Sequence, residues 1–130
     1  MGKRNVEALR SRLAEREPGV EWLCKTAEII AANALSWFEN CDILVEALDD
    51  AEQKAAFSGI LLAGGFFVVA ASGLGGYGLP PMSVKNIGKN FVCVGDFSTV
   101  ADQESPPLAP RVMQAAALQA DAVLARILKE

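Results

Sequence analysis

The sequence contains no histidine, and this absence excludes several kinds of active site. None of its 130 residues can supply the imidazole of a Ser-His-Asp triad, a Cys-His pair or a histidine-liganded zinc site. Its three cysteines, Cys24, Cys41 and Cys93, are widely spaced and form no Cys-x-x-Cys motif. This spacing argues against a zinc site, a thioredoxin-type motif and a disulfide framework, so we expect a cytoplasmic protein without zinc.

The chain also lacks an excess of basic residues. Lys and Arg number 12 against 16 for Asp and Glu, which gives a formal net charge of -4. A nucleic-acid-binding protein normally carries a basic patch that displaces counterions from phosphates, so we expect no nucleic-acid partner. With 52% hydrophobic and 22% charged residues, the composition is that of a globular protein. We expect a single domain over residues 1–130.

Charge is absent altogether between Lys54 and Lys85, and residues 55–73 are apolar or small throughout. A window of about 19 such residues is a candidate membrane span. The pair Gly64-Gly65 lies in the middle of this window and is typical of a helix end, and an apolar segment that favours a strand follows it. We therefore expect a buried helix and strand and no membrane contact, and keep the membrane span as an alternative.

The periodicity of apolar residues predicts alternating helices and strands. Helices are expected over 4–17, 32–38, 50–63 and from Pro110 onward, and strands over 20–25, 42–48, 66–71, 82–87 and 91–94. The last two strands form a hairpin that turns at residues 88–90. The predicted apolar face of the last helix consists of Met113, Ala116, Ala117, Ala120, Leu124, Ile127 and Leu128. This order indicates a partial Rossmann-like α/β fold with a mostly parallel sheet, as if the beginning of a doubly wound sheet were absent.

Two motifs could carry chemistry. Residues 73–78 match the dinucleotide fingerprint G-x-G-x-x-G, but Pro80-Pro81 follows where the fingerprint requires a helix start. A loop that lets an extended partner chain pass close to the backbone is the better interpretation. Asp49 ends a predicted strand, where open α/β sheets bind ligands, and its carboxylate could hold Mg²⁺. The simpler alternative is that Asp49 and Asp50 only favour the start of the next helix.

Four stretches together resemble the ThiF/MoeB/HesA family of ubiquitin-activating-enzyme-like adenylyltransferases, and most of all its thiamine-pathway ThiF branch. The resemblance covers nearly the whole chain and corresponds to the C-terminal half of such proteins. The stretches are GKRNVEAL from Gly2, CDILVEALDD from Cys41, VVAASGLGGYG from Val68, and GDF from Gly95 with PLAPRV from Pro107.

The resemblance implies an activity and a set of site residues. Such enzymes use MgATP to adenylate the C-terminal glycine of a ubiquitin-like sulfur carrier protein. Asp49 then stands at the family's catalytic, metal-binding and nucleotide-binding aspartate. Gly73, Gly75, Gly76 and Gly78 lie near the path of the carrier's tail.

Two departures from the family pattern bear on activity. The nucleotide-binding half, with its glycine-rich phosphate loop, has no counterpart in these residues, and Asn5 occupies the position of a phosphate-binding lysine. We therefore expect a sulfur-carrier adenylyltransferase that is incomplete and inactive alone, either a homodimer or joined by a missing N-terminal half. The alternative is a non-catalytic module, derived from that family, for carrier binding or dimerisation.

Overall fold

The computed structural model describes residues 5–26, 28–48 and 50–129, and its contacts divide the chain into two compact units, residues 1–30 and 31–130. The first unit contains helix α1 (Asn5–Arg16), which has no buried residue. After it, the side chain of Arg10 donates a hydrogen bond of 2.8 Å to the carbonyl oxygen of Trp22.

The predicted strand over residues 20–25 is wrong, because this segment pairs with no strand in the described parts of the chain. Trp22 and Cys24 do alternate with more exposed neighbours, as the sequence pattern indicated. An alternating pattern produces a strand only where a second strand takes up its backbone hydrogen bonds. Here the carbonyl of Trp22 is occupied by the side chain of Arg10.

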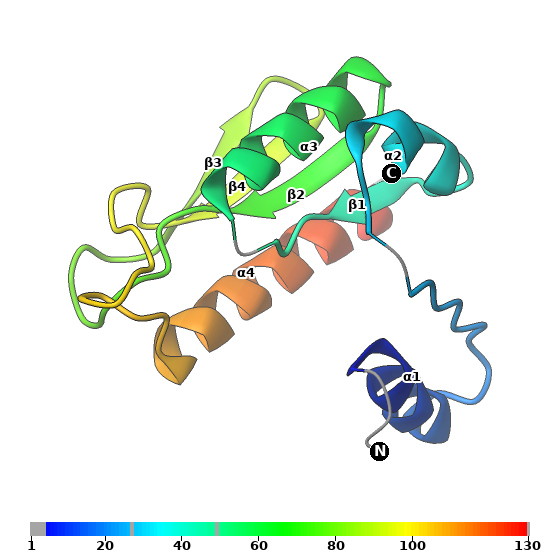
Figure 1. The fold of residues 1–130 in the computed structure, drawn as a ribbon, viewed down its shortest axis with the longest axis horizontal. Helices are drawn as coiled ribbons and strands as arrows, with labels where there is room; N and C mark the ends of the chain where they lie inside the picture. The colour runs from blue at the N-terminus through cyan, green and yellow to red at the C-terminus, as the bar shows by residue number, and fades with distance from the viewer. Residues whose placement is uncertain (1–4, 27, 49, 130) are drawn as a thin grey trace. The chain divides into compact units, whose positions relative to one another are not determined.

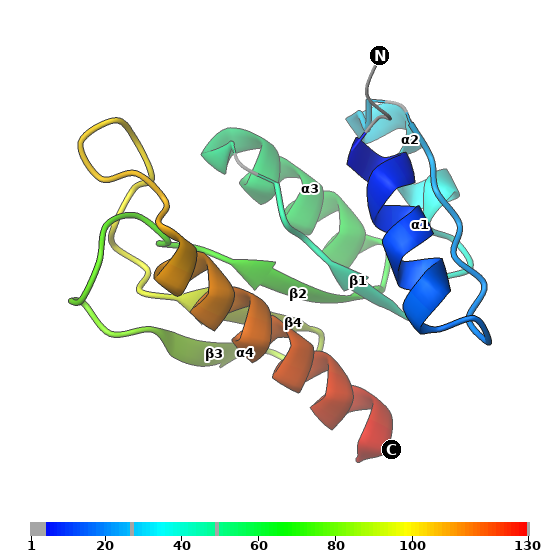
Figure 2. The same cartoon turned by 90° about the horizontal axis from the view of Figure 1, so that it is seen from below.

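The second unit contains the α/β fold that the sequence predicts (Figures 1 and 2). Its elements are α2 (Ala31–Trp37), β1 (Ile43–Val45), α3 (Ala51–Ala63), β2 (Phe67–Ala71), β3 (Ser83–Ile87), β4 (Phe91–Gly95) and α4 (Ala109–Leu128). The sheet order is β1-β2-β4-β3. Strands β1, β2 and β4 are parallel, and β3 forms the predicted antiparallel hairpin with β4.

Helix α3 begins and ends where the sequence predicts. The side chain of Asp50 accepts a 2.9 Å hydrogen bond from the backbone N–H of Gln53, as an N-cap does. At the other end Gly64 is the C-cap and Gly65 has a φ of +86°, a conformation that glycine adopts without steric cost. The chain then enters β2 directly, so the uncharged stretch is divided between a helix and a strand.

The sheet carries a hydrophobic cluster on each face, and the helices cover these two faces (Figure 2). On one face α3 packs on Leu44 and Val68 through Leu61. On the other face α4 packs through Ala115 on a cluster that includes Val69 and Val94. All five residues of β2 are buried, as expected for a central parallel strand covered on both sides.

The predicted apolar face of α4 is wrong, because all seven of its residues are exposed. The side of α4 that meets the sheet is formed by Arg111, Ala115 and Gln119, with Leu118 and Ala122 half-buried. A hydrophobicity pattern cannot identify this side, because two of its central residues are polar. They are buried because they form hydrogen bonds at the carboxyl ends of the strands.

In the described ranges, none of the helices combines the length and apolar character that crossing a membrane requires.

Candidate functional site

The carboxyl ends of β1 and β2 bring buried polar groups together. Glu46 directly follows β1, and its backbone N–H donates to the carbonyl oxygen of Val69 at 2.9 Å, which extends the parallel pairing. Its side chain is only 4% exposed. One carboxylate oxygen, Oε1, accepts a 2.5 Å hydrogen bond from the backbone N–H of Leu48. A negative charge is thus held at the sheet edge where open α/β sheets bind ligands.

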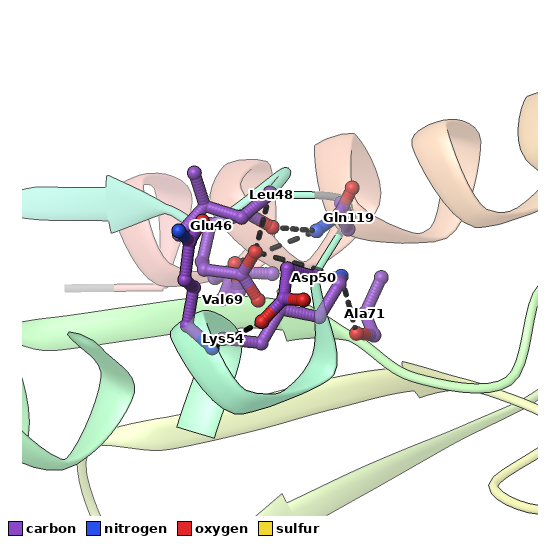
Figure 3. Close-up of polar contacts among 8 residues, drawn as sticks. Glu46, Leu48, Asp50, Lys54, Val69, Ala71 and Gln119 are labelled. Carbon is purple, nitrogen blue, oxygen red and sulfur yellow. Dashed lines mark hydrogen bonds and ion pairs between the residues drawn. The ribbon is translucent and has the colours of Figure 1, made fainter. Parts of the chain in front are cut away.

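Lys54 brings a positive charge to the same place from the beginning of α3 (Figure 3). Its ammonium group donates to the carbonyl oxygen of Ala71, the last residue of β2, at 3.0 Å. It also lies 3.5 Å from Oε1 of Glu46. The side chain of Lys54 is 20% exposed, so its ammonium group remains within reach of solvent.

Gln119 joins this cluster from α4, on the opposite face of the sheet (Figure 3). Its Nε2 atom donates to the carbonyl oxygen of Glu46 at 3.1 Å and lies 3.5 Å from that of Val69. Two strand ends and both covering helices are therefore tied to one another. The sequence analysis missed Glu46, Lys54 and Gln119. The available signal was a polar residue in an otherwise apolar stretch, which is not specific.

Glu46 has one hydrogen-bonding position left over. Its Oε2 atom is buried and accepts no hydrogen bond from the residues that the structure describes. Because buried polar atoms in folded proteins are nearly always paired, such an atom is a feature of candidate binding and catalytic sites. Chemically it can accept a proton or a hydrogen bond from a donor that reaches this end of the sheet.

A second polar cluster lies at the end of β4 and is centred on Asp96. Its Oδ1 atom accepts hydrogen bonds from the backbone N–H groups of Ser98 and Thr99, at 2.9 and 2.8 Å. Its Oδ2 atom forms a buried ion pair with Arg111. Burial alone would raise the pKa of Asp96, but the hydrogen bonds from Thr99 and Ser98 and the charge of Arg111 outweigh it and lower that pKa.

Arg111 connects this cluster to the glycine-rich loop. Its Nη1 atom donates to the carbonyl oxygens of Gly78 and Pro80, at 3.1 and 2.7 Å. One side chain from the first turn of α4 therefore fixes both the loop after β2 and the carboxylate after β4. We conclude that Arg111 holds the shape of this end of the molecule.

The four glycines of the loop are in two different environments. A Cβ atom at Gly73 would collide with the side chain of Asp96, and one at Gly75 would lie 2.7 Å from the carbonyl oxygens of Ser105 and Val100. At Gly76 and Gly78 a Cβ atom would meet nothing within 4 Å, although φ is +71° and +70° there. Gly73 and Gly75 are thus packed against the chain's own loop, whereas Gly76 and Gly78 border open space.

The same loop does not form a phosphate-binding helix start. It leads through Pro80-Pro81 into β3, in agreement with the interpretation that the G-x-G-x-x-G pattern is not a dinucleotide fingerprint here.

Cys93 lies inside β4, in register with Ala70 on one side and Lys85 on the other. The thiol is buried, and burial, together with the nearby charge of Glu46, raises its pKa. A reactive cysteine requires the opposite environment, accessible and electropositive. Cys93 is therefore a core residue, and all three cysteines are free thiols.

The comparison with protein families settles the kind of chain. The ThiF family profile matches residues 1–130, its full length. The chain belongs to the ThiF family. Comparison with curated proteins finds no significant match.

Among solved structures, the fold is similar to that of E. coli tRNA N6-threonylcarbamoyladenosine dehydratase, TcdA, which was crystallised in complex with AMP. The TM-score is 0.75 at 13% sequence identity, and the match covers 100% of this chain and 68% of that chain. At this identity the likeness concerns the fold, and it confirms a Rossmann-like architecture for this ThiF-family chain.

The remaining candidate residues of this ThiF-family chain are less well placed. Asp49 lies outside the described residues. Asn5 is the exposed first residue of α1, in the first compact unit. Within the described parts of the chain, no three acidic or cysteine side chains come together as a metal site would require. A role for Mg²⁺ therefore depends on Asp49 and on phosphate groups of a bound nucleotide, with which Mg²⁺ commonly completes its coordination.

Proposed function

We propose that this chain takes part in the ATP-dependent adenylation of the C-terminal glycine of a ubiquitin-like sulfur carrier protein of the thiamine pathway. The observation that carries the proposal is the ThiF-family match over the whole chain, together with a fold that TcdA, crystallised with AMP, shares. The glycine-rich phosphate loop comes from residues other than these 130. The chain described here is inactive without them.

The reaction sets clear demands on the site. A carboxylate oxygen of the terminal glycine attacks the α-phosphorus of ATP, a new C–O–P linkage forms, and pyrophosphate leaves. Both reactants are anions, so the site must supply positive charge and hold them in line. In this proposal the ammonium group of Lys54 and the N-terminus of α3 supply positive potential at the carboxyl ends of β1 and β2.

Specific residues receive roles by their position in the family pattern. Asp49 is the catalytic and metal-associated carboxylate, and Asn5 occupies the place of the phosphate-binding lysine. Because an amide carries no positive charge, Asn5 would weaken phosphate binding in comparison with lysine. Gly76 and Gly78 border open space, and this supports a path for the carrier's tail along them.

Carrier binding tests the proposal directly. A ThiS-type carrier ending in Gly-Gly is titrated onto the purified chain by isothermal calorimetry, alongside the same carrier without its last two residues. We expect binding by the intact carrier, weakened at least about tenfold by the truncation and by Gly76→Val. Gly59→Val, in the exposed face of α3, is the control substitution. No binding by the intact carrier, or equal binding by both forms, would refute the proposal.

Nucleotide binding separates catalysis from the alternative, a non-catalytic module for carrier binding or dimerisation. Asn5 in place of lysine is the observation that favours this alternative. We expect no carrier-dependent ATP–pyrophosphate exchange by the chain alone, and a thermal transition unmoved by MgATP. An upward shift in Tm would show that the chain binds nucleotide by itself, because a ligand selective for the native state stabilises it.

A further inference from the structure

The two edges of the sheet differ in a way that points to an additional strand. The outer strand β3 is fully exposed, carries Lys85 and Asn86, and pairs antiparallel, all of which are typical of a natural sheet edge. The opposite outer strand, β1, is Ile43-Leu44-Val45. It carries no charge, no proline and no polar residue, which is typical of an interior strand of a parallel sheet.

The backbone of β1 offers hydrogen bonds on its outer side. The N–H of Glu46 points toward β2, where it donates to Val69. Since backbone groups alternate along a strand, the N–H and C=O groups of Ile43 and Val45 point the other way. No strand among the described residues pairs with them. This edge can therefore accept one more strand.

A groove runs beside the same edge on the α4 side of the sheet. Helix α4 packs over β2 and β4, and β1 is left partly uncovered, so Val45 is 51% exposed. The groove has a volume of about 640 Å³ and is lined by Ile43 and Val45 from β1 and by Val123 and Ile127 from α4. An element lying in it would bury apolar side chains from both walls.

The exposed apolar side of α4 continues from this groove. Leu124 and Ile127 are each 53% exposed and Leu128 is 75% exposed. The three neighbouring features (an unpaired parallel edge, an apolar groove and an apolar helix side) have the shape that a strand followed by a helix would fill. The strand would extend the sheet, and the helix would lie in the groove beside α4.

We propose that the outer edge of β1 binds a parallel strand–helix unit from a polypeptide segment outside these 130 residues. The proposal rests on the proposed function only in taking such a completing segment to exist. Carrier binding is measured separately, so either proposal can fail without the other. The unmatched 32% of the TcdA chain shows that the same fold accommodates further elements of this size.

A second copy of this chain fits the edge less well. Two copies related by a twofold axis pair their β1 strands antiparallel. Centred on Leu44, the middle of the strand, this pairing sets Asp42 directly opposite Glu46 of the other copy. Like charges in directly opposed positions destabilise a sheet. A parallel strand from a different segment has no such conflict.

Site-specific photo-crosslinking in the cells that express the protein tests the proposal. A benzophenone side chain is placed at Val45 or, as a matched control, at Ile87, which is 53% exposed on the opposite edge of the sheet. Crosslinked peptides are then identified by mass spectrometry. We expect adducts at Val45 alone, on an apolar strand segment that precedes a glycine-rich turn and a helix.

Lysine variants provide the second measurement. Val45→Lys places a charge on the proposed interface and should weaken recovery of the crosslinked partner at least about tenfold, while Ile87→Lys should not. Val45 and Ile87 are both half exposed, so either variant should fold, which its thermal transition checks. Equal adducts at both edges, adducts on residues 41–47 of a second copy, or full recovery with Val45→Lys would overturn the proposal.

Discussion

At the scale of single residues, four buried polar side chains organise the ends of the strands. Glu46, Asp96, Arg111 and Gln119 are each at most 9% exposed, and each contacts an element distant in sequence. Burying a charge without a partner is costly, so such residues are retained where partners are built for them. Their contacts join the loops at the carboxyl ends of the strands to α4.

The Asp96–Arg111 pair should make stability depend on pH. Because the pKa of Asp96 is lowered by folding, its carboxylate contributes stability above the unfolded-state pKa, about 3.9, and loses it as pH falls through the lower folded value. We expect Asp96→Asn to cost about 3 kcal/mol or more at pH 7, with a smaller difference in strong acid. Urea unfolding at a series of pH values measures this.

Asp102 provides the matched control for Asp96. It is exposed, and its Oδ1 atom accepts backbone hydrogen bonds from Glu104 and Ser105 in the same way, at 2.9 and 2.8 Å. It forms no ion pair with a described residue. Asp102→Asn should cost about 1 kcal/mol or less. Equal losses for both variants would mean that the buried ion pair contributes nothing.

Burial should protect Cys93 from thiol reagents. Its pKa is raised by burial and by Glu46, so at neutral pH the thiol is neutral as well as covered. In native protein at pH 7.5 we expect Cys41, which is exposed, to react with a thiol reagent such as dithionitrobenzoate, and Cys93 to react only after unfolding. Mass spectrometry of labelled peptides follows both sites. Rapid native labelling of Cys93 would contradict the core assignment.

At the scale of elements, α4 shows how a helical pattern can indicate the wrong side. The sequence places seven apolar residues on one stripe of this helix, and all seven are exposed. The side that packs on the sheet contains Arg111 and Gln119 instead. A pattern identifies an apolar side but not what covers it, and here the apolar side continues from the groove at the edge of β1.

Two glycines in different elements should respond to alanine in opposite directions. Gly59 lies on the exposed side of α3 with no atom near a new Cβ, so Gly59→Ala should raise the free energy of unfolding by about 0.5–1 kcal/mol. At Gly75 a Cβ would lie 2.7 Å from two carbonyl oxygens, and Gly75→Ala should lower it by about 1–3 kcal/mol. Chemical denaturation compares both with the parent. A neutral Gly75→Ala would show that the loop adapts.

At the scale of the whole molecule, the folding information is concentrated in the second compact unit. Both hydrophobic clusters consist of residues after Ala31, and α1 has no buried residue. We expect residues 31–130 expressed alone to unfold cooperatively, because the packed core remains intact. Circular dichroism during heating tests this. A broad, non-cooperative transition would show that residues 1–30 contribute to the core.

The sequence alone was sufficient for the elements whose signals are local. The Asp50 cap, the Gly64-Gly65 helix end and the β3–β4 hairpin depend on neighbouring residues, and the structure confirms each of them. The fold class also followed from the order of elements, and the ThiF-family resemblance came from several motifs in order. The roles of Asp49, Asn5 and the four glycines in adenylation stay predictions.

Only the tertiary structure decided which polar groups meet. Glu46 and Gln119 are 73 positions apart, and Asp96 and Arg111 are 15 apart, so no local pattern reveals either contact. The same is true of the false strand at residues 20–25, which has the right alternation but no partner among the described residues. Pairing between strands and burial against a distant helix are properties of the assembled sheet, and a sequence pattern gives only each segment's own preference.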